Sequence, residues 1–486
     1  MLDLPSKLVD SIQESVENQL KKPSLKSFIH SGLQQISQQQ ESHYLAFSFP
    51  FEKINPIALL DKIGSKEDFR YHWERQDLKL SFTGSGVIAR LESNGTDRFK
   101  NISSRVHEIQ EKTLTYEGID HPLSGLNFLG GFSFFDEVHS NDWRKFGSGN
   151  FVIPEWIYIR SKKDNILTIT LEISPNKDFE DVYNLLSDKL ETITQKLIQS
   201  TSFKSPAAEL SYKIEKRADA YEHWETSVEK ATQLITEGAF NKIVLARDIR
   251  VKTNRMISAT RLLHHLREHY RTSYCFLIQN NNSSAFVGCS PERLASFHSN
   301  FVLAEGLAGS ISRDEDKAKD EELAERLLNS SKDRQEHSFV VEAIEKRLKQ
   351  FTDQIDYPEI PTIKKYINVQ HLYTPITAWL NDKVDPLLVL ERLHPTPAVG
   401  GTPRKEALPW IKVLENFERG WYAGPVGWFN SKGNGEFCVA IRSGLIYDNK
   451  ARFYAGCGIV KNSVPQSEWE ETNLKFIPML SAIQYA

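Results

Sequence analysis

Apolar and polar residues alternate over many short stretches of this chain. Between residues 43 and 173 these stretches are separated by Gly, Asn, Asp or Pro, and they include HYLAFSFPF, LKLSFTGSGVIARL and ILTITLEIS. Such alternation predicts short strands. Similar stretches recur after residue 240, where Gly, Asn and Asp turns join them in pairs, as in GWFNSKGNGEFCVAI and LIYDNKARFYAG. These turns favour hairpins, so we expect large, mainly antiparallel sheets.

Helical periodicity occurs between the predicted strands. Sparse apolar positions in a polar background predict one or two amphipathic surface helices over residues 6–40. Further helices are expected at 178–200, 219–237, 257–270, 314–350, 387–393, 404–417 and 467–483. Helices that flank antiparallel sheets indicate an α+β fold.

The segment KSPAAEL at residues 204–210 has the composition of a connector between elements. It suggests a boundary near residue 205. We therefore predict a polar helical extension over residues 1–40, a sheet-rich half over 41–205, and a second half over 206–486 that alternates strands with helices.

Composition and charge exclude several classes of protein. With 60 Lys and Arg against 64 Asp and Glu, the net charge of −4 disfavours binding to nucleic acid. No stretch approaches the 18 or so apolar residues of a membrane helix, and the N-terminus lacks the apolar core of a secretory signal. The 4 cysteines form no CxxC pair. This pattern disfavours a disulfide framework or a structural zinc site, so we expect a reduced, cytoplasmic protein.

Charged and small residues at strand ends offer candidates for chemistry. Lys242 opens the strand that follows the predicted helix end at Gly238, and Glu292 lies in the segment SPERL. Taken singly, Lys242 is more simply an ordinary strand-edge charge, and Glu292 reads equally well as a turn or helix-start acid and as a catalytic acid. The run Ala308, Gly309 and Ser310 would let backbone N–H groups approach a carboxylate, although a simple glycine turn explains it as well.

Acidic residues on two predicted helices suggest a metal site. Glu336 lies four residues after Lys332, and Glu468 and Glu471 share one helical face. Surface ion pairs explain this spacing without a metal. The alternative is that Glu336, Glu468 and Glu471 bind one hard divalent ion, for which oxygen ligands and waters suit Mg²⁺.

The start of the last predicted helix is suggested by a second pattern. Ser467 followed by Glu470 matches a capping box, which gives Glu470 a structural role. Lys475 lies four residues after Glu471, so the two side chains are expected to pair on one face.

Ten segments in a fixed order resemble the chorismate-utilising enzyme family, and isochorismate synthases in particular. They are EGAFNKIVLAR, GCSPERL, GLAGSISR, KDRQEH, VQHLYTPI, LHPTPAVGGTPR, ERGWYAGPVGW, GNGEFCVAIRSG, FYAGCGIV and SEWEETNLK. Together they cover roughly residues 219–478, and as an ordered set they are far more specific than any one motif. The first half resembles the family more faintly through HWERQDLKLSFTGSG, FLGGFSFFDE and FVIPEW.

The resemblance implies a layered fold of mainly antiparallel sheets, with residues 206–486 as the chorismate-binding catalytic half. It also implies a reaction, the isomerisation of chorismate to isochorismate. Lys242 would be the general base for a water that attacks C2 of the ring. Glu292 would be the general acid for the departing C4 hydroxyl, and that role requires a raised pKa. His371 would position the water or the hydroxyl, although a purely structural histidine is an equal alternative.

The resemblance further implies how the dianionic substrate and the metal are held. Mg²⁺ on Glu336 and Glu471, with Glu468 acting through water, would hold the ring carboxylate. The matching substrate-binding positions are Arg442, Lys475, Ala308, Gly309, Ser310, Gly456 and Gly458.

The same residues help to distinguish this chain from related enzymes with other activities. Anthranilate and aminodeoxychorismate synthases usually lack a lysine at the position of Lys242, and aminodeoxychorismate synthases resemble PIKGT where this chain has Ala308. We therefore expect no glutaminase subunit and a monomer. Salicylate synthases share both Lys242 and Glu292, so that activity stays open, as does a non-catalytic chorismate-binding role. Of the possible pathways, the long first half favours menaquinone over siderophore biosynthesis.

Overall fold

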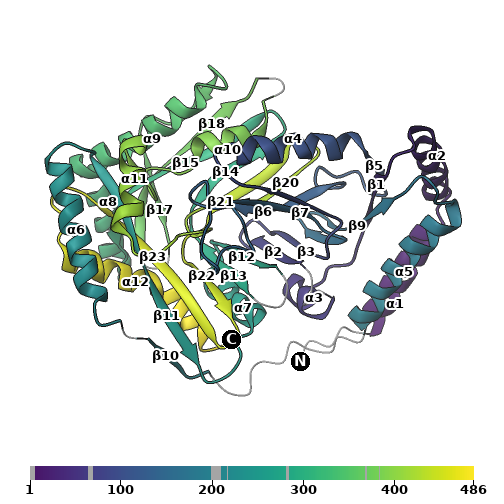
Figure 1. Ribbon diagram of the computed structural model, residues 1–486, viewed down its shortest axis with the longest axis horizontal. Coiled ribbons are helices and arrows are strands. Elements are labelled where there is room, and N and C mark those ends of the chain that lie inside the picture. Colours follow the sequence, from purple (N-terminus) through teal and green to yellow (C-terminus); the bar gives the residue numbers. More distant parts are fainter. Residues whose placement is uncertain are drawn as a thin grey trace.

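The alternating segments fold into strands of two large sheets. The computed structural model describes residues 6–63, 69–198, 210–215, 217–280, 284–366, 369–381 and 384–486 (Figure 1). Within this part of the chain every strand pairing is antiparallel except that of β1 with β5. The predicted mainly antiparallel α+β architecture is confirmed.

The first sheet is 13-stranded in the described residues and follows the order β10-β11-β23-β22-β13-β12-β2-β3-β8-β9-β1-β5, with β19 paired to β11. Its strands are β1 (His43–Pro50), β2 (Phe69–Arg75), β3 (Leu80–Ser85), β5 (Thr113–Glu117), β8 (Trp156–Arg160), β9 (Asn165–Ile173), β10 (Tyr212–Ile214), β11 (Lys242–Thr253), β12 (Tyr274–Asn280), β13 (Ala285–Ser290), β19 (Gly401–Thr402), β22 (Ser443–Tyr447) and β23 (Lys450–Ile459).

The second sheet is 10-stranded over the same described residues and follows the order β16-β18-β15-β14-β21-β20-β6-β7-β4, with β17 paired to β18. Its strands are β4 (Ala89–Ser93), β6 (Asn127–Phe132), β7 (Gly149–Ile153), β14 (Arg293–His298), β15 (Phe301–Ser312), β16 (Ile355–Asp356), β17 (Thr362–Lys365), β18 (Val369–Trp379), β20 (Pro425–Asn430) and β21 (Asn434–Val439).

Helices surround the two sheets, with α6, α8, α11 and α12 gathered at one end of the molecule and α1, α2 and α5 at the other (Figure 1). Their bounds are α1 (Ser6–Leu20), α2 (Pro23–Gln39), α3 (Pro56–Ile63), α4 (Arg98–Glu111), α5 (Phe179–Ile198), α6 (Ala220–Thr236), α7 (Ala259–His269), α8 (Lys317–Asn329), α9 (Ser331–Leu348), α10 (Pro386–Leu393), α11 (Arg404–Leu414) and α12 (Pro465–Ile483). None of the described helices is long and apolar enough to cross a membrane.

Large aromatic side chains fill the space between the sheets. Phe82 on β3 stacks on Trp428 of β20 with ring centroids 3.9 Å apart, and Trp73 on β2 meets the same indole edge-on at 6.4 Å. All three rings are buried. Rings of this size dominate core energetics, so this contact joins the first sheet to the second.

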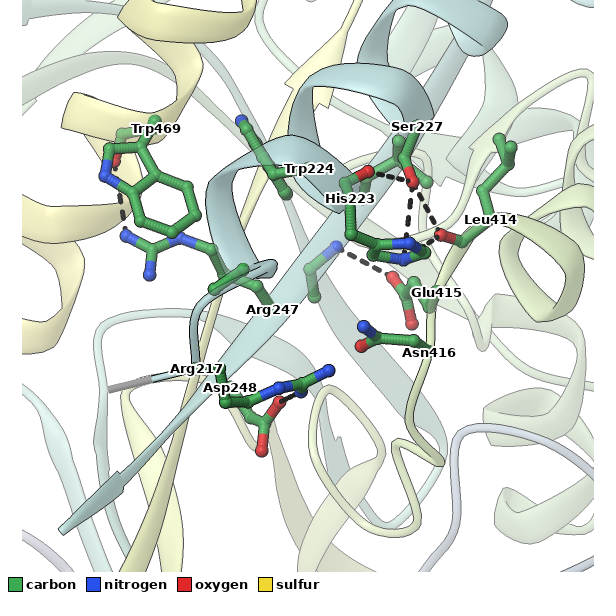
Figure 2. A pocket seen from close by; sticks show the side chains of 13 residues that line it. Arg217, His223, Trp224, Ser227, Arg247, Asp248, Leu414, Glu415, Asn416 and Trp469 are labelled. Carbon is green, nitrogen blue, oxygen red and sulfur yellow. Dashed lines mark hydrogen bonds and ion pairs between the residues drawn. The ribbon is translucent and has the colours of Figure 1, made fainter. Parts of the chain in front are cut away.

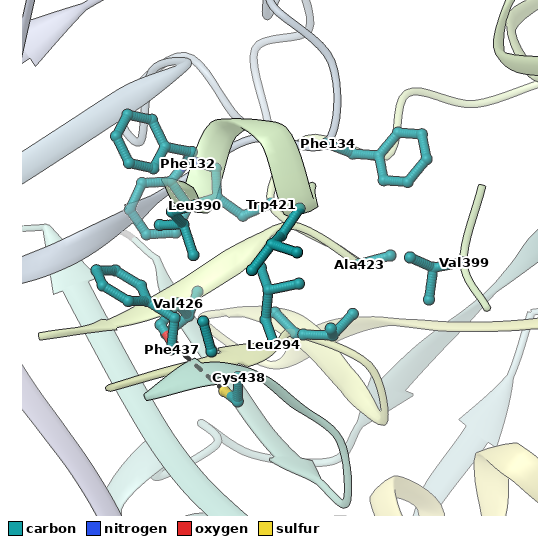
Figure 3. Packing of buried hydrophobic residues seen from close by; sticks show 14 of the residues in the cluster. Phe132, Phe134, Leu294, Leu390, Val399, Trp421, Ala423, Val426, Phe437 and Cys438 are labelled. Atoms are coloured by element: carbon teal, nitrogen blue, oxygen red, sulfur yellow. Dashed lines mark hydrogen bonds between the residues drawn. The ribbon is translucent and has the colours of Figure 1, made fainter. Parts of the chain in front are cut away.

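A second group of core side chains lies around β14, the strand that begins just after Glu292. Figure 3 shows Leu294 of β14 among Val426 and Phe437 of the neighbouring strands, with Leu390 of α10 nearby. Because these residues are almost completely buried, the start of β14 is held in a close-packed environment.

Two helix predictions are corrected by the structure. The region 314–350 divides into α8 and α9 because Ser330 is extended and its side chain accepts a hydrogen bond from Asp333 N, capping the second helix. The capping box at Ser467 is wrong. Helix α12 begins at Pro465, which suits the first helical position, and Glu470 instead accepts a hydrogen bond from Gln466.

The chain is not divided cleanly between the sheets. Each sheet combines strands from before and after residue 205. The predicted boundary near that residue lies outside the described residues. Helices α1 and α2 of the predicted N-terminal extension place Ile12, Leu25 and Ile29 in a buried cluster with β1 and α5.

Candidate active site

Lys242 is the first residue of β11. Its Nζ donates a hydrogen bond to Glu336 Oε1 on α9 at 2.9 Å. The lysine also lies over Gly458 of β23, where an added Cβ would come within 2.7 Å of Lys242 Cε. A larger residue at 458 would therefore displace the lysine, which explains a glycine there.

Glu292 lies in the turn between β13 and β14, and not in a helix. Thr396 Oγ1 donates a hydrogen bond to Glu292 Oε1 at 3.4 Å. Desolvation raises the pKa of Glu292 to about 7, and the negative charge of Glu305 adds to this, while Lys242 and Lys475 act in the opposite direction. A carboxyl group with this pKa carries a proton near neutrality and can release it, as a general acid requires.

His371 on β18 faces the small-residue run of β15. Its Nδ1 lies 2.7 Å from Ser310 Oγ. The strand register shifts between Ala308 and Ser310, and Gly309 has a φ of 72°, so the backbone bulges at this point. Burial lowers the pKa of His371 to about 4, and Arg442 and Lys475 repel its protonated form as well. The imidazole is therefore neutral near pH 7.

Arg442 follows β21 with a φ of 52°, in the left-handed region that larger side chains seldom adopt. Its Nε is buried and has no hydrogen-bond partner within the part of the chain that the structure describes. Burial lowers the pKa of Arg442, but an arginine stays charged at neutral pH. A buried guanidinium donor without a partner is costly unless a ligand supplies one, so this position suits an anion.

Lys475 on α12 connects Glu471, one of the predicted metal residues, to β23. Its Nζ donates to Glu471 Oε1 at 2.6 Å and to the carbonyl of Gly456 at 2.9 Å. Gly456 lies two residues before Gly458, the glycine that Lys242 covers. The structure therefore brings the two pairs, Lys242 with Glu336 and Lys475 with Glu471, to neighbouring positions along β23.

The three predicted metal ligands do not form a ready-made cluster. Among the described residues, no group of three or more His, Cys, Asp or Glu side chains lies close enough to hold an ion. Glu336 and Glu471 are instead each paired with a lysine. Their partly exposed carboxylates nevertheless fit Mg²⁺, which keeps several waters and needs only one or two protein carboxylates. The magnesium site stays a prediction.

Contacts made by Arg247 of β11 hold α12 in place. Figure 2 shows the guanidinium of Arg247 against the indole of Trp469, and the distance to the ring centroid is 3.5 Å. Arg247 also donates to Thr472 Oγ1 at 2.7 Å and to Asn473 Oδ1 at 2.5 Å. These contacts tie β11, which carries Lys242, to the turns of α12 that follow Glu468 and contain Glu471.

Several side chains of this region were not predicted. Thr396 donates directly to Glu292, Tyr366 donates to the carbonyl of the preceding Pro291, and Arg293 on the other side donates to Glu305. Thr396 and Arg293 stand inside segments that carry the family resemblance, and Glu305 immediately precedes one, which was the available signal. Tyr366 lies outside those segments, and nothing in its sequence context marks it.

Comparison with known proteins identifies the family. The family model described as "Chorismate binding enzyme" matches residues 31–484. The chain belongs to the chorismate-binding enzymes. Isochorismate synthase MenF of Bacillus subtilis (strain 168) is 33% identical to it over 448 residues, covering 90% of this chain and 93% of the relative. The salicylate biosynthesis isochorismate synthase of Pseudomonas aeruginosa is 32% identical over 440 residues and covers 90% of each chain.

Solved structures agree with this placement of the chorismate-binding enzyme. The menaquinone-specific isochorismate synthase MenF from Escherichia coli superposes with a TM-score of 0.75 at 26% identity, covering 95% of this chain and 100% of that one. Anthranilate synthase component I from Streptococcus pneumoniae TIGR4, at 19% identity and a TM-score of 0.68, shares the fold. The predicted resemblance to the chorismate-utilising family is confirmed.

Proposed function

We propose that this chorismate-binding enzyme is an isochorismate synthase. The observation that carries the proposal is the placement of Lys242 and Glu292 within electrostatic reach of each other, with the pKa of Glu292 at about 7. A base and a proton-carrying acid at one site are what the addition of water and the loss of hydroxide require. The names of the two relatives described above support the same reaction.

In the proposed reaction, Lys242 accepts a proton from water while the water oxygen bonds to C2 of chorismate. The ring double bonds shift, the C4–O bond breaks, and Glu292 gives its proton to the departing hydroxyl, which leaves as water. Lys242 then releases its proton to solvent and Glu292 takes one up, which restores the site. One water enters and one leaves, so the net change is an isomerisation. Neutral His371, next to Ser310, would accept a hydrogen bond from either water or donate one to it.

The two carboxylates of chorismate call for cations and N–H donors. Arg442, whose Nε is buried, and the partly exposed Lys475 would supply the cations, and the bulge at Ala308 to Ser310 would supply backbone N–H groups. The glycines Gly456 and Gly458 would leave room for the substrate along β23.

Magnesium is part of the proposal. Glu336 and Glu471 would hold it directly, and Glu468 through water. The bound ion would supply positive charge for the ring carboxylate of chorismate.

We further propose that the product serves menaquinone biosynthesis, since two relatives described above carry the name MenF. Because water and not ammonia is the nucleophile, a glutaminase subunit is not needed, and we propose a monomer. The cysteines are all free and buried, which suits the cytoplasm.

The deciding experiment is incubation of the purified protein with chorismate and Mg²⁺, with and without a chelator, and separation of the products by chromatography with mass detection. We expect an isomer of equal mass, formed without pyruvate. Salicylate with pyruvate would establish a salicylate synthase. No metal-dependent conversion would indicate a non-catalytic chorismate-binding protein.

A further inference from the structure

The carboxyl group of Glu292 has little direct support, whereas its two neighbours in sequence are firmly held. The one hydrogen bond to that carboxyl within the described residues is the long one from Thr396, at 3.4 Å. Its position must therefore follow from the backbone of the turn between β13 and β14, where Glu292 N donates to Ser290 Oγ at 3.2 Å and Val439 N donates to the Glu292 carbonyl at 3.1 Å. Both Pro291 and Arg293, which flank it in the chain, are tied to other segments.

Arg293 is held by two buried carboxylates. Its Nη1 donates to Glu305 Oε1 on β15, and its Nε donates to Glu436 Oε1 on β21, both at 2.9 Å. Each carboxylate is 5% exposed. Tyr274 OH completes the set at 2.9 Å from the same Nε. Charge-assisted hydrogen bonds in a desolvated setting are strong and directional, so Arg293 has one well-defined position.

Pro291, the neighbour that precedes Glu292, is held by Tyr366. The phenol donates a hydrogen bond to the Pro291 carbonyl at 2.8 Å. The same ring lies edge-on to His371, with centroids 5.7 Å apart. Tyr366 thus contacts both the turn that carries the candidate acid and the candidate histidine.

Arg293 and the strand that leads to Tyr366 both contact Glu305. Lys364, two residues before Tyr366, donates to Glu305 Oε2 at 2.7 Å, while the other oxygen of that carboxylate receives Arg293. Lys364 also lies over the ring of Tyr373, 4.5 Å from its centroid. The end of β17 and the start of β14 are therefore joined through one buried carboxylate.

We propose that Tyr366 and Arg293 are positioning residues for Glu292. They hold the turn at residues 291 and 293, and so keep the carboxyl in a place where it is desolvated yet aimed at the substrate. The proposal rests on the proposed function, in which Glu292 is the general acid.

A loosened turn would change the surroundings of this carboxyl in a predictable direction. The charged groups that act on Glu292 are Glu305 on β15, Lys242 on β11 and Lys475 on α12, and Tyr366 lies beside it. If the turn moves outward, water reaches the carboxyl and the pKa of Glu292 falls toward its ordinary value. A general acid must be protonated, so the alkaline limb of activity would then move to lower pH.

The test is Tyr366→Phe, which keeps the ring and removes only the hydrogen bond to Pro291. We expect kcat for chorismate to fall about tenfold, with KM nearly unchanged and the alkaline limb of the kcat profile lower by roughly half a pH unit. Tyr357→Phe is the matched control, because its phenol donates to Glu345 on α9, and not to the turn. This variant should keep the kcat and pH profile of the unaltered protein.

Arg293→Lys provides a second variant, since a lysine cannot reach Glu305 and Glu436 with two separate N–H donors in the same geometry. We expect a larger fall in kcat and the same direction of pH shift. A lower melting temperature with an unmoved alkaline limb in both variants would overturn the proposal, because that is the signature of a merely structural role.

A failure of the proposed function would look different. In that case Glu292→Gln would keep its activity, whatever the Tyr366 and Arg293 variants do. If Glu292→Gln is inactive while Tyr366→Phe and Arg293→Lys keep the unaltered kcat and pH profile, the general acid stands and the positioning role is lost.

Discussion

Two desolvated glutamates of this protein have opposite properties. Glu74 on β2 is 0% exposed and receives hydrogen bonds from Arg160 at 2.8 Å and from Arg267, with His72 nearby. Although burial alone raises the pKa of Glu74, His72 and Arg267 outweigh it and bring the pKa to about 2. Glu292 has no arginine on its carboxyl among the described residues, and its pKa rises to about 7.

The difference teaches what separates a structural carboxylate from a candidate acid. Burial acts on both groups in the same direction. Where arginines form ion pairs with the buried carboxylate, it stays ionised and has a structural role. Here the ion pairs of Glu74 join β2 to β8 and α7. Where no arginine pairs with the carboxyl, the proton stays on it and can be used in chemistry. This is the case at Glu292, since the adjacent Arg293 pairs with other carboxylates.

Replacing Glu292 by Gln should have the largest effect on activity. The amide keeps the shape but has no acidic proton to give to the leaving hydroxyl, so we expect kcat to fall by about 10²- to 10⁴-fold. The melting temperature should not fall, because an uncharged group replaces a desolvated one. Steady-state kinetics and thermal unfolding of the same preparation check both parts. Full activity would remove Glu292 as the acid.

Replacing Glu74 by Gln should lower stability and leave kcat unchanged. Arg267 and Arg160 would lose their buried counter-charge, and breaking such a pair costs about 3–5 kcal/mol of unfolding free energy. Denaturant unfolding measures this loss. The kcat of the folded fraction should stay the same, since Glu74 touches none of the candidate site residues. Loss of kcat in the folded fraction would contradict the division between the two glutamates.

The two groups should also oppose each other in the pH dependence of stability. Glu74 has a folded pKa of about 2, below the ordinary value of 4.5, so it contributes about 3 kcal/mol above pH 4.5 that is lost as the pH falls toward 2. Glu292 has a folded pKa of about 7, so it costs up to about 3 kcal/mol that develops as the pH rises from 4.5 to 7.

Denaturant unfolding at pH 3.5 to 7.5 separates these contributions. Relative to the unaltered protein, Glu292→Gln should gain stability as the pH rises toward 7. Glu74→Gln should have a lower free energy of unfolding than the unaltered protein at pH 6, and the difference should be smaller at pH 3.5. Parallel curves for all three proteins would show that neither pKa departs from the ordinary value.

The sequence predicted the parts of this site that depend on local pattern and on ordered motifs. The strand that begins at Lys242 and the Glu471–Lys475 pair on α12 are both present, whereas Gly309 lies at a bulge within β15 and not in a simple turn. The start of α12 was predicted wrongly because two helix-start signals lie close together there. Pro465 suits the first helical position, and Ser467 suits a cap, so the local pattern alone does not decide between them.

The supporting contacts could not be predicted, because they join residues far apart in the chain. Tyr366 and Pro291 are 75 positions apart, and Arg267 and Glu74 are 193 apart. Such pairs depend on the order of strands in the sheets, and no local propensity specifies which strands become neighbours. The contrast between Glu74 and Glu292 is therefore visible only in the folded protein.

The smallest expected effect concerns a third carboxylate, Glu471, which is half exposed and paired with Lys475. It lies between the two extremes, since it is neither buried among cations nor desolvated. If it is a magnesium ligand, Glu471→Gln should raise the Mg²⁺ concentration for half-maximal activity by about tenfold, with little change in melting temperature. Glu470→Gln is the matched control, because Glu470 on the same helix accepts a hydrogen bond from Gln466 instead. Titration of the apoprotein with Mn²⁺, followed by electron paramagnetic resonance, measures binding apart from turnover. An unchanged affinity in Glu471→Gln would place the metal elsewhere and leave this residue as an ordinary surface ion pair.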